Sequence, residues 1–349
     1  MTNKRPLPAI FGCAGHELSP NERGFFAQVQ PFGFILMQRN CLSPAQVRNL
    51  VAELREAVGR ADAPVFIDQE GGRVARLQPP HWPKFPSAGS IGKMYLYDRA
   101  LGLEAAGIIG NLIGHELRQI GVTANCAPVL DIAYPETHQA IGDRAFAADP
   151  LIVAEVARAY VEGMLEQGIL PVIKHLPGHG RATVDPHLEL PVVSETREAL
   201  AADFMPFRKL SALPIGMTSH ILFSAIDPKF PASQSPAVIR DIIRGAIGFN
   251  GLLLSDDLDM KAVKGSMLVR AEKTLAAGTD IVLICNSGAA ALTEAGTLLP
   301  RMTEQAWERW KTAQTFIRKP QFLDIGALNH RLDMISAVAE MGNSSNFSI

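Results

Sequence analysis

The feature that most constrains the fold of this chain is the regular recurrence of short apolar runs. Eight such runs occupy residues 8–13, 33–37, 64–68, 122–131, 170–175, 213–220, 251–257 and 280–285. Each has the length of a buried strand and is far too short to cross a membrane. Between most of the runs, apolar residues recur at three- and four-residue steps, which is typical of amphipathic helices. Strands that alternate with helices favour a parallel sheet.

The helical segments carry recognisable start signals. Segment 43–59 begins with Ser43 as a candidate N-cap, and segment 149–168 begins with Asp149 followed by a proline. The same pattern continues in 196–210, 235–248, 268–278 and 288–302. Eight strands are the number that closes a (β/α)8 barrel, and 349 residues suit one such barrel with a few insertions. We therefore predict an α/β fold, a single-domain (β/α)8 TIM barrel.

Two stretches fall outside this alternation. Residues 69–94 are rich in glycine and proline, and we expect them to form a long loop after the third strand. Residues 336–349 end in GNSSNFSI and are expected to be a mobile C-terminal tail. The predicted barrel domain is then 1–335, and no second domain has room to form.

Composition narrows the classes of partner. The chain has 33 basic and 35 acidic residues, a net charge of −2 and no basic run, so we expect no nucleic-acid partner. The N-terminus lacks the long apolar core of a signal peptide, and we expect no membrane partner. Four cysteines lie far apart without a CxxC pair, which favours reduced thiols over disulfides or a zinc site: Cys13, Cys41, Cys126 and Cys285. We expect a cytoplasmic monomer.

Polar residues stand at the ends of five of the eight predicted strands. They are Asp68, Asp131, Lys174 with His175, His220, and Asp256 with Asp257. In TIM barrels the active site lies at the C-terminal ends of the strands. One such residue alone would simply meet solvent, but a ring of Asp, Lys and His suits a hydroxyl-rich ligand. Carboxylates accept hydrogen bonds from sugar hydroxyls, whereas lysine and arginine donate to their oxygens.

The loop KHLPGHGRATVDPHLELP, residues 174–191, holds a sharper pattern. Asp185 and His187 flank Pro186, which favours an extended backbone at Asp185. Residues i and i+2 of an extended segment point to the same side, so the carboxylate can accept from one ring nitrogen of His187. That contact fixes the tautomer and raises basicity, leaving the other nitrogen for general acid/base catalysis. A surface loop with incidental charges is the alternative reading.

Four motifs in order resemble a known family: IDQEGGRVARL (67–77), GDRAF (142–146), KHLPGHG…VDPH (174–187) and LLSDDLDM (253–260). Over about residues 8–290 the chain resembles the single-domain family 3 glycoside hydrolases, in particular bacterial β-N-acetylhexosaminidases that recycle cell-wall fragments. The resemblance implies a TIM barrel and a retaining mechanism. It also implies removal of terminal N-acetylglucosamine from peptidoglycan-derived muropeptides, with no cofactor and no metal.

The resemblance also implies roles for individual residues. Asp256 matches the nucleophile, His187 the acid/base and Asp185 its partner. The positions that match sugar-binding residues are Asp68, Arg76, Arg144, Lys174 and His175. Retaining glycosidases need a carboxylate nucleophile and a proton donor, and a histidine donor adds no second negative charge. Asp257 is then a supporting neighbour or a structural cap, and Glu189 is the rival acid.

The chain departs from the family pattern at three places. The family often has Phe at the position of Leu176, Asp-Thr at Arg181-Ala182, and Ser at Pro186. The first two change packing and charge beside the sugar, and the proline stiffens the loop. None removes a catalytic group.

Four other functions remain open from the residues alone. A Schiff-base aldolase would use Lys174. Metal-assisted hydrolysis would use His175, His179, His187 and Asp185. A non-catalytic sugar-binding protein would need the same binding residues, but not Asp256 together with the Asp185–His187 pair. A phosphorylase of the same family would use phosphate in place of water, helped by the charge of Arg181.

Overall fold

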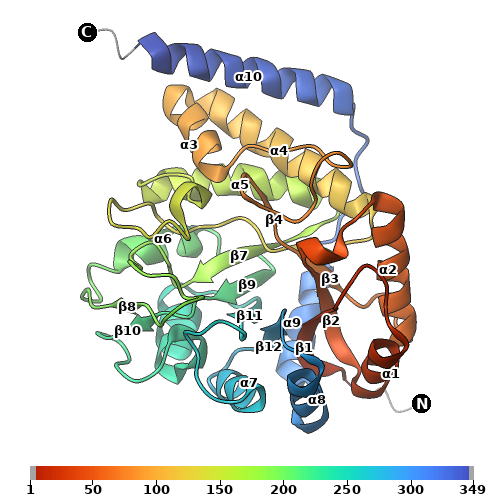
Figure 1. Cartoon of the computed structure of the whole chain (residues 1–349). Helices are drawn as coiled ribbons and strands as arrows, with labels where there is room; N and C mark the ends of the chain where they lie inside the picture. The colour runs from red at the N-terminus through yellow and green to blue at the C-terminus, as the bar shows by residue number, and fades with distance from the viewer. Residues whose placement is uncertain (1–4, 346–349) are drawn as a thin grey trace.

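The computed structural model describes residues 5–345, and its centre is a closed barrel of parallel strands (Figure 1). The strands neighbour one another in the order β1-β12-β11-β9-β7-β6-β3-β2. Their bounds are β1 (Leu7–Gly12), β2 (Pro31–Leu36), β3 (Val65–Ile67), β6 (Ala124–Asn125), β7 (Leu170–Leu176), β9 (Ile215–Thr218), β11 (Leu252–Asp257) and β12 (Ile281–Ile284). Each predicted apolar run supplies one of these strands, so the predicted (β/α)8 TIM barrel is confirmed.

Helices surround the barrel (Figure 1). The predicted segments correspond to α2 (Pro44–Ala57), α5 (Pro150–Glu166), α6 (Ala201–Lys209), the π-helical η4 (Val238–Ala246), α7 (Met267–Ala276) and α8 (Ala289–Leu298). The Ser43 and Asp149 side chains accept hydrogen bonds from the first turns of α2 and α5, as the sequence predicted. Helices that were not predicted are α1 (Pro20–Val29), α3 (Ala88–Tyr97), α4 (Arg99–Gln119), α9 (Glu304–Gln314) and α10 (Ile325–Ser345).

The prediction that residues 69–94 form one long loop is wrong in part. It begins with an antiparallel hairpin of β4 (Gln69–Gly71) and β5 (Val74–Ala75). The hairpin turns at Gly72, whose φ of +56° favours glycine. Its last residues open α3, capped by the Ser87 hydroxyl, which accepts from the backbone N–H of Ser90. Two glycines inside α3 and the prolines before it weaken the helical signal in the sequence.

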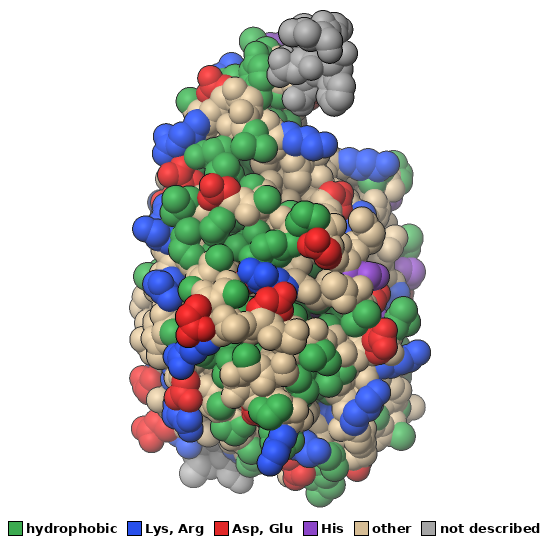
Figure 2. All heavy atoms as spheres, turned by 90° about the vertical axis from the view of Figure 1, so that its left-hand side faces the viewer, with side chains coloured by type: hydrophobic (Ala, Val, Ile, Leu, Met, Phe, Trp, Pro, Cys, Tyr) green, Lys and Arg blue, Asp and Glu red, His purple; other side chains and the backbone are tan. Residues whose placement is uncertain are grey.

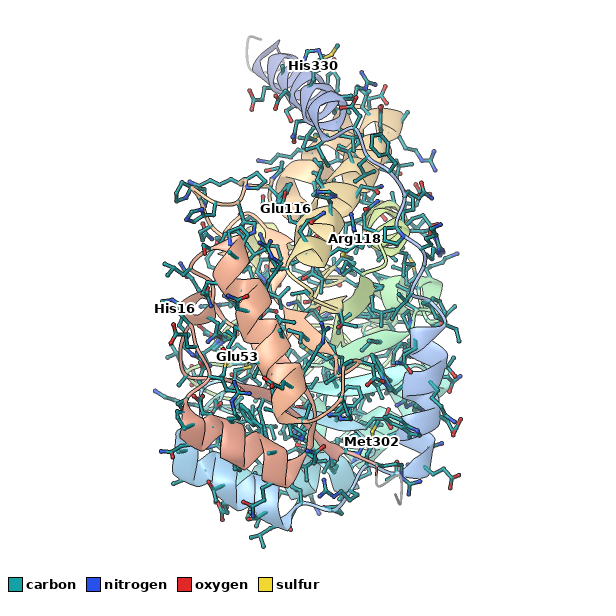
Figure 3. The ribbon with its side chains drawn as sticks, turned by 90° about the vertical axis from the view of Figure 1, so that its right-hand side faces the viewer. His16, Glu53, Glu116, Arg118, Met302 and His330 are labelled. Carbon is teal, nitrogen blue, oxygen red and sulfur yellow. The ribbon has the colours of Figure 1, made fainter. Side chains whose placement is uncertain are left out.

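The segment expected as a tail begins inside α10. This helix lies over α3 and α4, and an ion pair of 2.7 Å joins Arg331 to Glu104 (Figure 1). Figure 3 places His330 of α10 above Glu116 and Arg118 of α4. Residues 336–345 are therefore helical, and residues 346–349 lie outside the described part of the chain.

The barrel interior is filled with apolar side chains and is closed at its N-terminal end by α9. The Trp310 ring of α9 meets the Phe32 ring edge-on, with centroids 5.0 Å apart. The backbone N–H of Met302 donates to the carbonyl of Pro6 at the start of β1. Since α9 covers the N-terminal end of the barrel, the C-terminal ends of the strands are left open for a pocket.

Short elements complete the chain and shape the C-terminal face. They are β8 (Val192–Val193), β10 (Leu222–Phe223), η1 (Gln38–Asn40), η2 (Gly142–Arg144) and η3 (Ala232–Gln234). On the face shown in Figure 2, basic and acidic side chains are interspersed, in keeping with the small net charge. Between residues 5 and 345 no helix is both long and apolar enough to span a membrane.

The contact between α4 and α5 gives a test of the packing. A Cβ added to Gly163 of α5 would lie 2.3 Å from the carbonyl oxygen of Gly107 and 2.7 Å from the backbone nitrogen of Asn111. Gly163→Ala should therefore push the helices apart and lower the free energy of unfolding by about 1–3 kcal/mol. Urea denaturation monitored by circular dichroism measures this change.

The matched control is Gly107→Ala on the facing helix. There the nearest atom to an added Cβ is 3.8 Å away, so the gain in helix propensity should leave stability unchanged or raise it by about 0.5–1 kcal/mol. Equal effects of the two substitutions would contradict this packing.

Candidate active site

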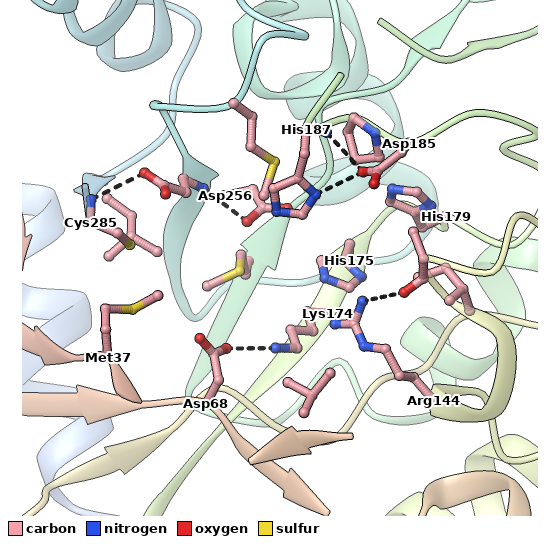
Figure 4. A pocket seen from close by; sticks show the side chains of 18 of the residues that line it. Met37, Asp68, Arg144, Lys174, His175, His179, Asp185, His187, Asp256 and Cys285 are labelled. Carbon is pink, nitrogen blue, oxygen red and sulfur yellow. Dashed lines mark hydrogen bonds and ion pairs between the residues drawn. The ribbon is translucent and has the colours of Figure 1, made fainter. Parts of the chain in front are cut away.

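A pocket of about 290 Å³ opens at the C-terminal ends of the strands (Figure 4). All of the predicted site residues line it: Asp68, Arg76, Arg144, Lys174, His175, Asp185, His187 and Asp256. Further lining comes from apolar or thiol side chains such as Met37, Met217, Met260, Leu283 and Cys285. The structure therefore brings together, in one cavity, residues that lie up to 188 positions apart in the sequence (68 to 256).

One wall of the pocket is a network of buried charges. Lys174 at the end of β7 is only 2% exposed, and its Nζ lies 2.9 Å from Asp68 Oδ1 and 2.6 Å from Glu70 Oε1. Arg76 Nη2 donates to the other Asp68 oxygen at 3.0 Å. Arg144 binds Glu70 through two nitrogens, at 2.9 and 2.8 Å. Three cations and two carboxylates thus alternate, so that each ion lies beside at least one ion of the opposite charge.

The network keeps its members charged. Burial acts to raise the pKa of Asp68, but Lys174 and Arg76 outweigh it and hold that pKa below its usual range. Burial is likewise outweighed at Glu70, whose pKa falls to about 2 beside Arg144 and Lys174. The pKa of Lys174 is raised by the two carboxylates against the effect of burial. A Schiff-base lysine must lose its proton to attack a carbonyl, so these surroundings argue against the aldolase alternative.

Glu70 is the member of this network that the sequence analysis missed. It lies on β4, two residues after Asp68, inside the quoted motif IDQEGGRVARL. A charged residue directly before two glycines in that motif was the available signal.

His175 is oriented from behind by Asp131. Its Nδ1 donates to Asp131 Oδ2 at 2.7 Å, and the other carboxylate oxygen accepts from the backbone N–H groups of His175 and His179 at 3.2 and 2.7 Å. Asp131 itself is 1% exposed. The expectation that it stands on the pocket rim is therefore wrong, because its oxygens are used inside the protein.

His220 also lies behind the pocket rather than on its rim. It is fully buried, and its ring nitrogens contact the Ser233 hydroxyl at 2.7 Å and the Asp257 carbonyl at 3.1 Å. Both corrections have the same cause, since a strand end places a side chain near the rim without deciding which way it faces.

Asp256 is the penultimate residue of β11 and is held as a carboxylate. Its Oδ1 accepts the backbone N–H of Asp257 at 2.8 Å. Burial acts to raise its pKa, but the nearby His175 and His220 outweigh burial and lower it. Asp257 is tied in turn to the end of β12, accepting from the backbone of Cys285 at 3.1 Å and from Asn286 Nδ2 at 3.2 Å. A buried, ionised carboxylate on a rigid strand is suited to nucleophilic attack.

The Asp185–His187 pair has the predicted geometry. His187 Nδ1 donates to Asp185 Oδ1 at 2.7 Å, and the backbone N–H of His187 donates to the same oxygen at 2.9 Å. Burial acts to raise the pKa of Asp185, but the hydrogen bonds from His187 outweigh it and lower it. The His187 side chain is 63% exposed, so it has access to both pocket and solvent. The loop is tied down where the Pro186 carbonyl accepts from the Ala262 N–H at 3.1 Å.

Three remaining expectations concern the rival acid Glu189, the family departure at Leu176 and a metal site. Glu189, the rival acid, is exposed and does not line the pocket. Leu176 is buried in the packing outside the barrel rather than facing the pocket. Within residues 5–345, no group of three or more His, Cys, Asp or Glu side chains is arranged to hold a metal ion.

The pH dependence of stability tests the surroundings of Asp257. Burial and the neighbouring Asp259 raise the pKa of Asp257 to about 7, against about 3.9 in an unfolded chain. Between these values the folded state binds the extra proton, so stability from this group is present below about pH 4 and lost as pH rises to about 7. The free energy of unfolding of the wild type, relative to Asp257→Asn, should fall over that window.

Chemical denaturation at a series of pH values measures this difference. In Asp259→Asn the pKa of Asp257 should be lower, which shifts the loss of stability to lower pH. A difference between wild type and Asp257→Asn that stays constant from pH 4 to 8 would show that Asp257 ionises normally.

Comparison with known proteins shows which family the chain belongs to. The chain matches the family described as "Glycosyl hydrolase family 3 N terminal domain" over residues 19–309. A protein named β-hexosaminidase from Alkalilimnicola ehrlichii is 39% identical over 284 residues, with 80% of this chain and 80% of the relative covered. A β-hexosaminidase from Aromatoleum aromaticum is 38% identical over 288 residues, with 81% and 80% covered.

Solved structures give the same result. The structure of NagZ from Neisseria gonorrhoeae in complex with N-trifluoroacetyl-D-glucosamine has a TM-score of 0.85 and 28% identity, covering 97% of this chain and 100% of that one. A family 3 β-N-acetylglucosaminidase from Paenibacillus sp. has a TM-score of 0.82 and 29% identity, covering 94% of this chain and 66% of that one. This chain therefore belongs to the β-hexosaminidases of glycosyl hydrolase family 3.

Proposed function

We propose that this protein is a retaining exo-β-N-acetylglucosaminidase that works through a covalent glycosyl-Asp256 intermediate. The observation that carries the proposal is one cavity lined by an ionised, buried Asp256 and by His187 hydrogen-bonded to Asp185. These are the two groups that a double displacement needs. The related NagZ structure with a glucosamine derivative supports N-acetylglucosamine as the sugar.

In the first step, an Asp256 oxygen attacks the anomeric carbon while the glycosidic bond breaks. The leaving oxygen takes a proton from His187, whose ring is held in place by its hydrogen bond to the Asp185 carboxylate. In the second step, His187 takes a proton from water, whose oxygen attacks the anomeric carbon and releases Asp256. The product keeps the β configuration because two inversions occur.

The buried charge network supplies the sugar-binding groups in this proposal. Asp68, Arg76, Arg144, Lys174 and His175 line the pocket and bind the terminal sugar. Their mutual contacts hold them in position before the sugar arrives, which lowers the entropy lost on binding. Asp68 lines the pocket and is already ionised, so its oxygens accept from sugar hydroxyls without a change of protonation. Glu70 does not line the pocket and serves as the ionised partner of Lys174 and Arg144.

We further propose that the natural substrates are peptidoglycan-derived muropeptides, split in the cytoplasm by a monomeric enzyme. The four sequence motifs shared with enzymes of cell-wall recycling support this substrate. The cysteines Cys13, Cys41, Cys126 and Cys285 are free thiols, which fits a reducing compartment.

The position of Arg181 weakens the phosphorylase alternative, which used its charge to attract phosphate. Arg181 does not line the pocket; its Nε binds Asp203 at 2.7 Å and its Nη2 donates to the Tyr134 hydroxyl at 2.9 Å. Its charge is therefore used in anchoring the loop instead of in attracting phosphate. Product analysis with and without phosphate separates the two activities, and we expect free N-acetylglucosamine at an unchanged rate in both.

Replacing His187 tests the proposed mechanism through its dependence on the leaving group. A sugar or alkyl leaving group needs a proton, so His187→Ala should lose about 10²–10⁴-fold in the first step with such substrates. A dinitrophenolate leaving group needs little protonation, and the loss of that step should be small. Steady-state and pre-steady-state rates with a series of β-N-acetylglucosaminides measure the difference.

Azide supplies the second half of the same test. An anion needs no general base, so azide should restore turnover of His187→Ala and yield a β-glycosyl azide. Asp185→Ala should show a weaker form of the same behaviour, because His187 remains but loses its partner. Glu189→Ala is the control and should behave as the wild type. Equal losses with good and poor leaving groups, without azide rescue, would remove His187 from the acid/base role.

A further inference from the structure

His179 is a buried histidine in the pocket wall that the proposed mechanism does not use. Three histidines are buried in the described chain: His175, His179 and His220. Both His175 and His220 have hydrogen-bonded rings. The ring of His179 forms no hydrogen bond with any described residue, although it is only 3% exposed and its Nδ1 is completely buried.

The backbone around His179 fixes its position. Its N–H donates to Asp131 Oδ1 at 2.7 Å, the same carboxylate that orients His175. Gly180 lies so close to the barrel that an added Cβ would be 2.0 Å from the Ile132 carbonyl oxygen. The His179 ring meets the His175 ring edge-on, with centroids 5.4 Å apart. Figure 4 shows His179 between Asp185 and Arg144, on the edge of the cavity.

An unpaired polar group in this position is costly unless a ligand meets it. A buried donor or acceptor without a partner destabilises the folded state, because it has given up its hydrogen bonds to water. Burial and the neighbouring His175 lower the pKa of His179 to about 4, so its ring is neutral near pH 7. A neutral imidazole offers one N–H donor and one acceptor nitrogen. Because Nδ1 has no exposed surface, only Nε2 is left to meet a ligand in the cavity that His179 lines, and it can donate to or accept from a sugar hydroxyl or an acetamide.

We propose that His179 is a further substrate-contacting residue, which hydrogen-bonds through its neutral ring to a hydroxyl or the acetamido group of the sugar in the pocket. This proposal rests on the proposed function, because it takes the occupant to be N-acetylglucosamine. It gives His179 a role in recognition and none in proton transfer.

His179→Phe and His179→Gln test the proposal together. Phenylalanine keeps the ring packed against His175 but removes both nitrogens, and kcat/KM for aryl β-N-acetylglucosaminides should fall about 10-fold or more. Glutamine keeps a donor and an acceptor, so it should recover part of that loss. The melting temperature of His179→Phe should equal or exceed that of the wild type, since a buried unpaired nitrogen is gone. His330→Phe on α10 is the matched surface control, with unchanged kinetics expected.

Substrate analogues identify the group that His179 contacts. The loss in His179→Phe should disappear for the one analogue, deoxygenated or lacking the acetamido group, that cannot make the contact. An equal loss with every analogue would show that His179 acts only through His175, and an unchanged kcat/KM in His179→Phe would show that the ring only packs. Either result overturns the proposal.

Binding of free N-acetylglucosamine, measured by calorimetry, separates this proposal from the proposed function. If the wild type binds the sugar and His179→Phe binds it at least several-fold more weakly, the contact is supported even should hydrolysis fail. If the wild type does not bind the sugar, or both bind it equally, the contact is overturned.

Discussion

The site depends on the buried ammonium group of Lys174. An unpaired charge in the barrel interior would cost several kcal/mol, so Lys174 requires Asp68 and Glu70 at 2.9 and 2.6 Å. Those carboxylates in turn require Arg76 and Arg144. The contacts join the ends of β3 and β7 to the β4–β5 hairpin and to η2. A pocket built in this way has its shape set before any ligand arrives.

The balance of charge in this wall also serves the neighbouring nucleophile. Three cations face two carboxylates, which leaves one net positive charge beside Asp256. Lys174 is among the groups that lower the pKa of Asp256, after His175 and His220. The nucleophile therefore stays ionised in a place where burial alone would favour its protonated form. In this account the same ions bind the sugar and keep Asp256 reactive.

The two proposed catalytic groups are mounted in different ways. Asp256 belongs to a barrel strand and is fastened through Asp257 to the next strand. His187 belongs to a loop anchored at its stem by Arg181 and, near its tip, by Pro186 to Ala262. A rigid nucleophile and a loop-borne acid/base suit a reaction in which the sugar stays in place while the leaving group departs and water enters.

Much of the fold and the site is predictable from local sequence patterns. The eight strands follow from short apolar runs, and the contact between Asp185 and His187 follows from the i, i+2 geometry around Pro186. What the sequence does not determine is the direction of a side chain at a strand end. Asp131 therefore lies behind the pocket, and Glu70, from a hairpin expected as loop, joins the buried charges that support the pocket wall.

The family resemblance names residue roles, but a resemblance alone does not say how each group is kept in its protonation state. That depends on neighbours far away in the sequence, such as Glu70 to Arg144 across 74 residues. His179 shows the same limit, because only the assembled pocket reveals that its buried Nδ1 has no hydrogen-bond partner among the described residues.

The most direct test of the covalent mechanism is to trap its intermediate. A 5-fluoro derivative of N-acetylglucosaminyl fluoride keeps the acetamido group and slows both steps, and the good leaving group lets the glycosyl-enzyme accumulate. Peptide mapping by mass spectrometry then locates the ester. The account predicts one labelled residue, Asp256, and loss of labelling in Asp256→Asn. Labelling of Asp257 or Asp68, or inactivation without a covalent adduct, would contradict it.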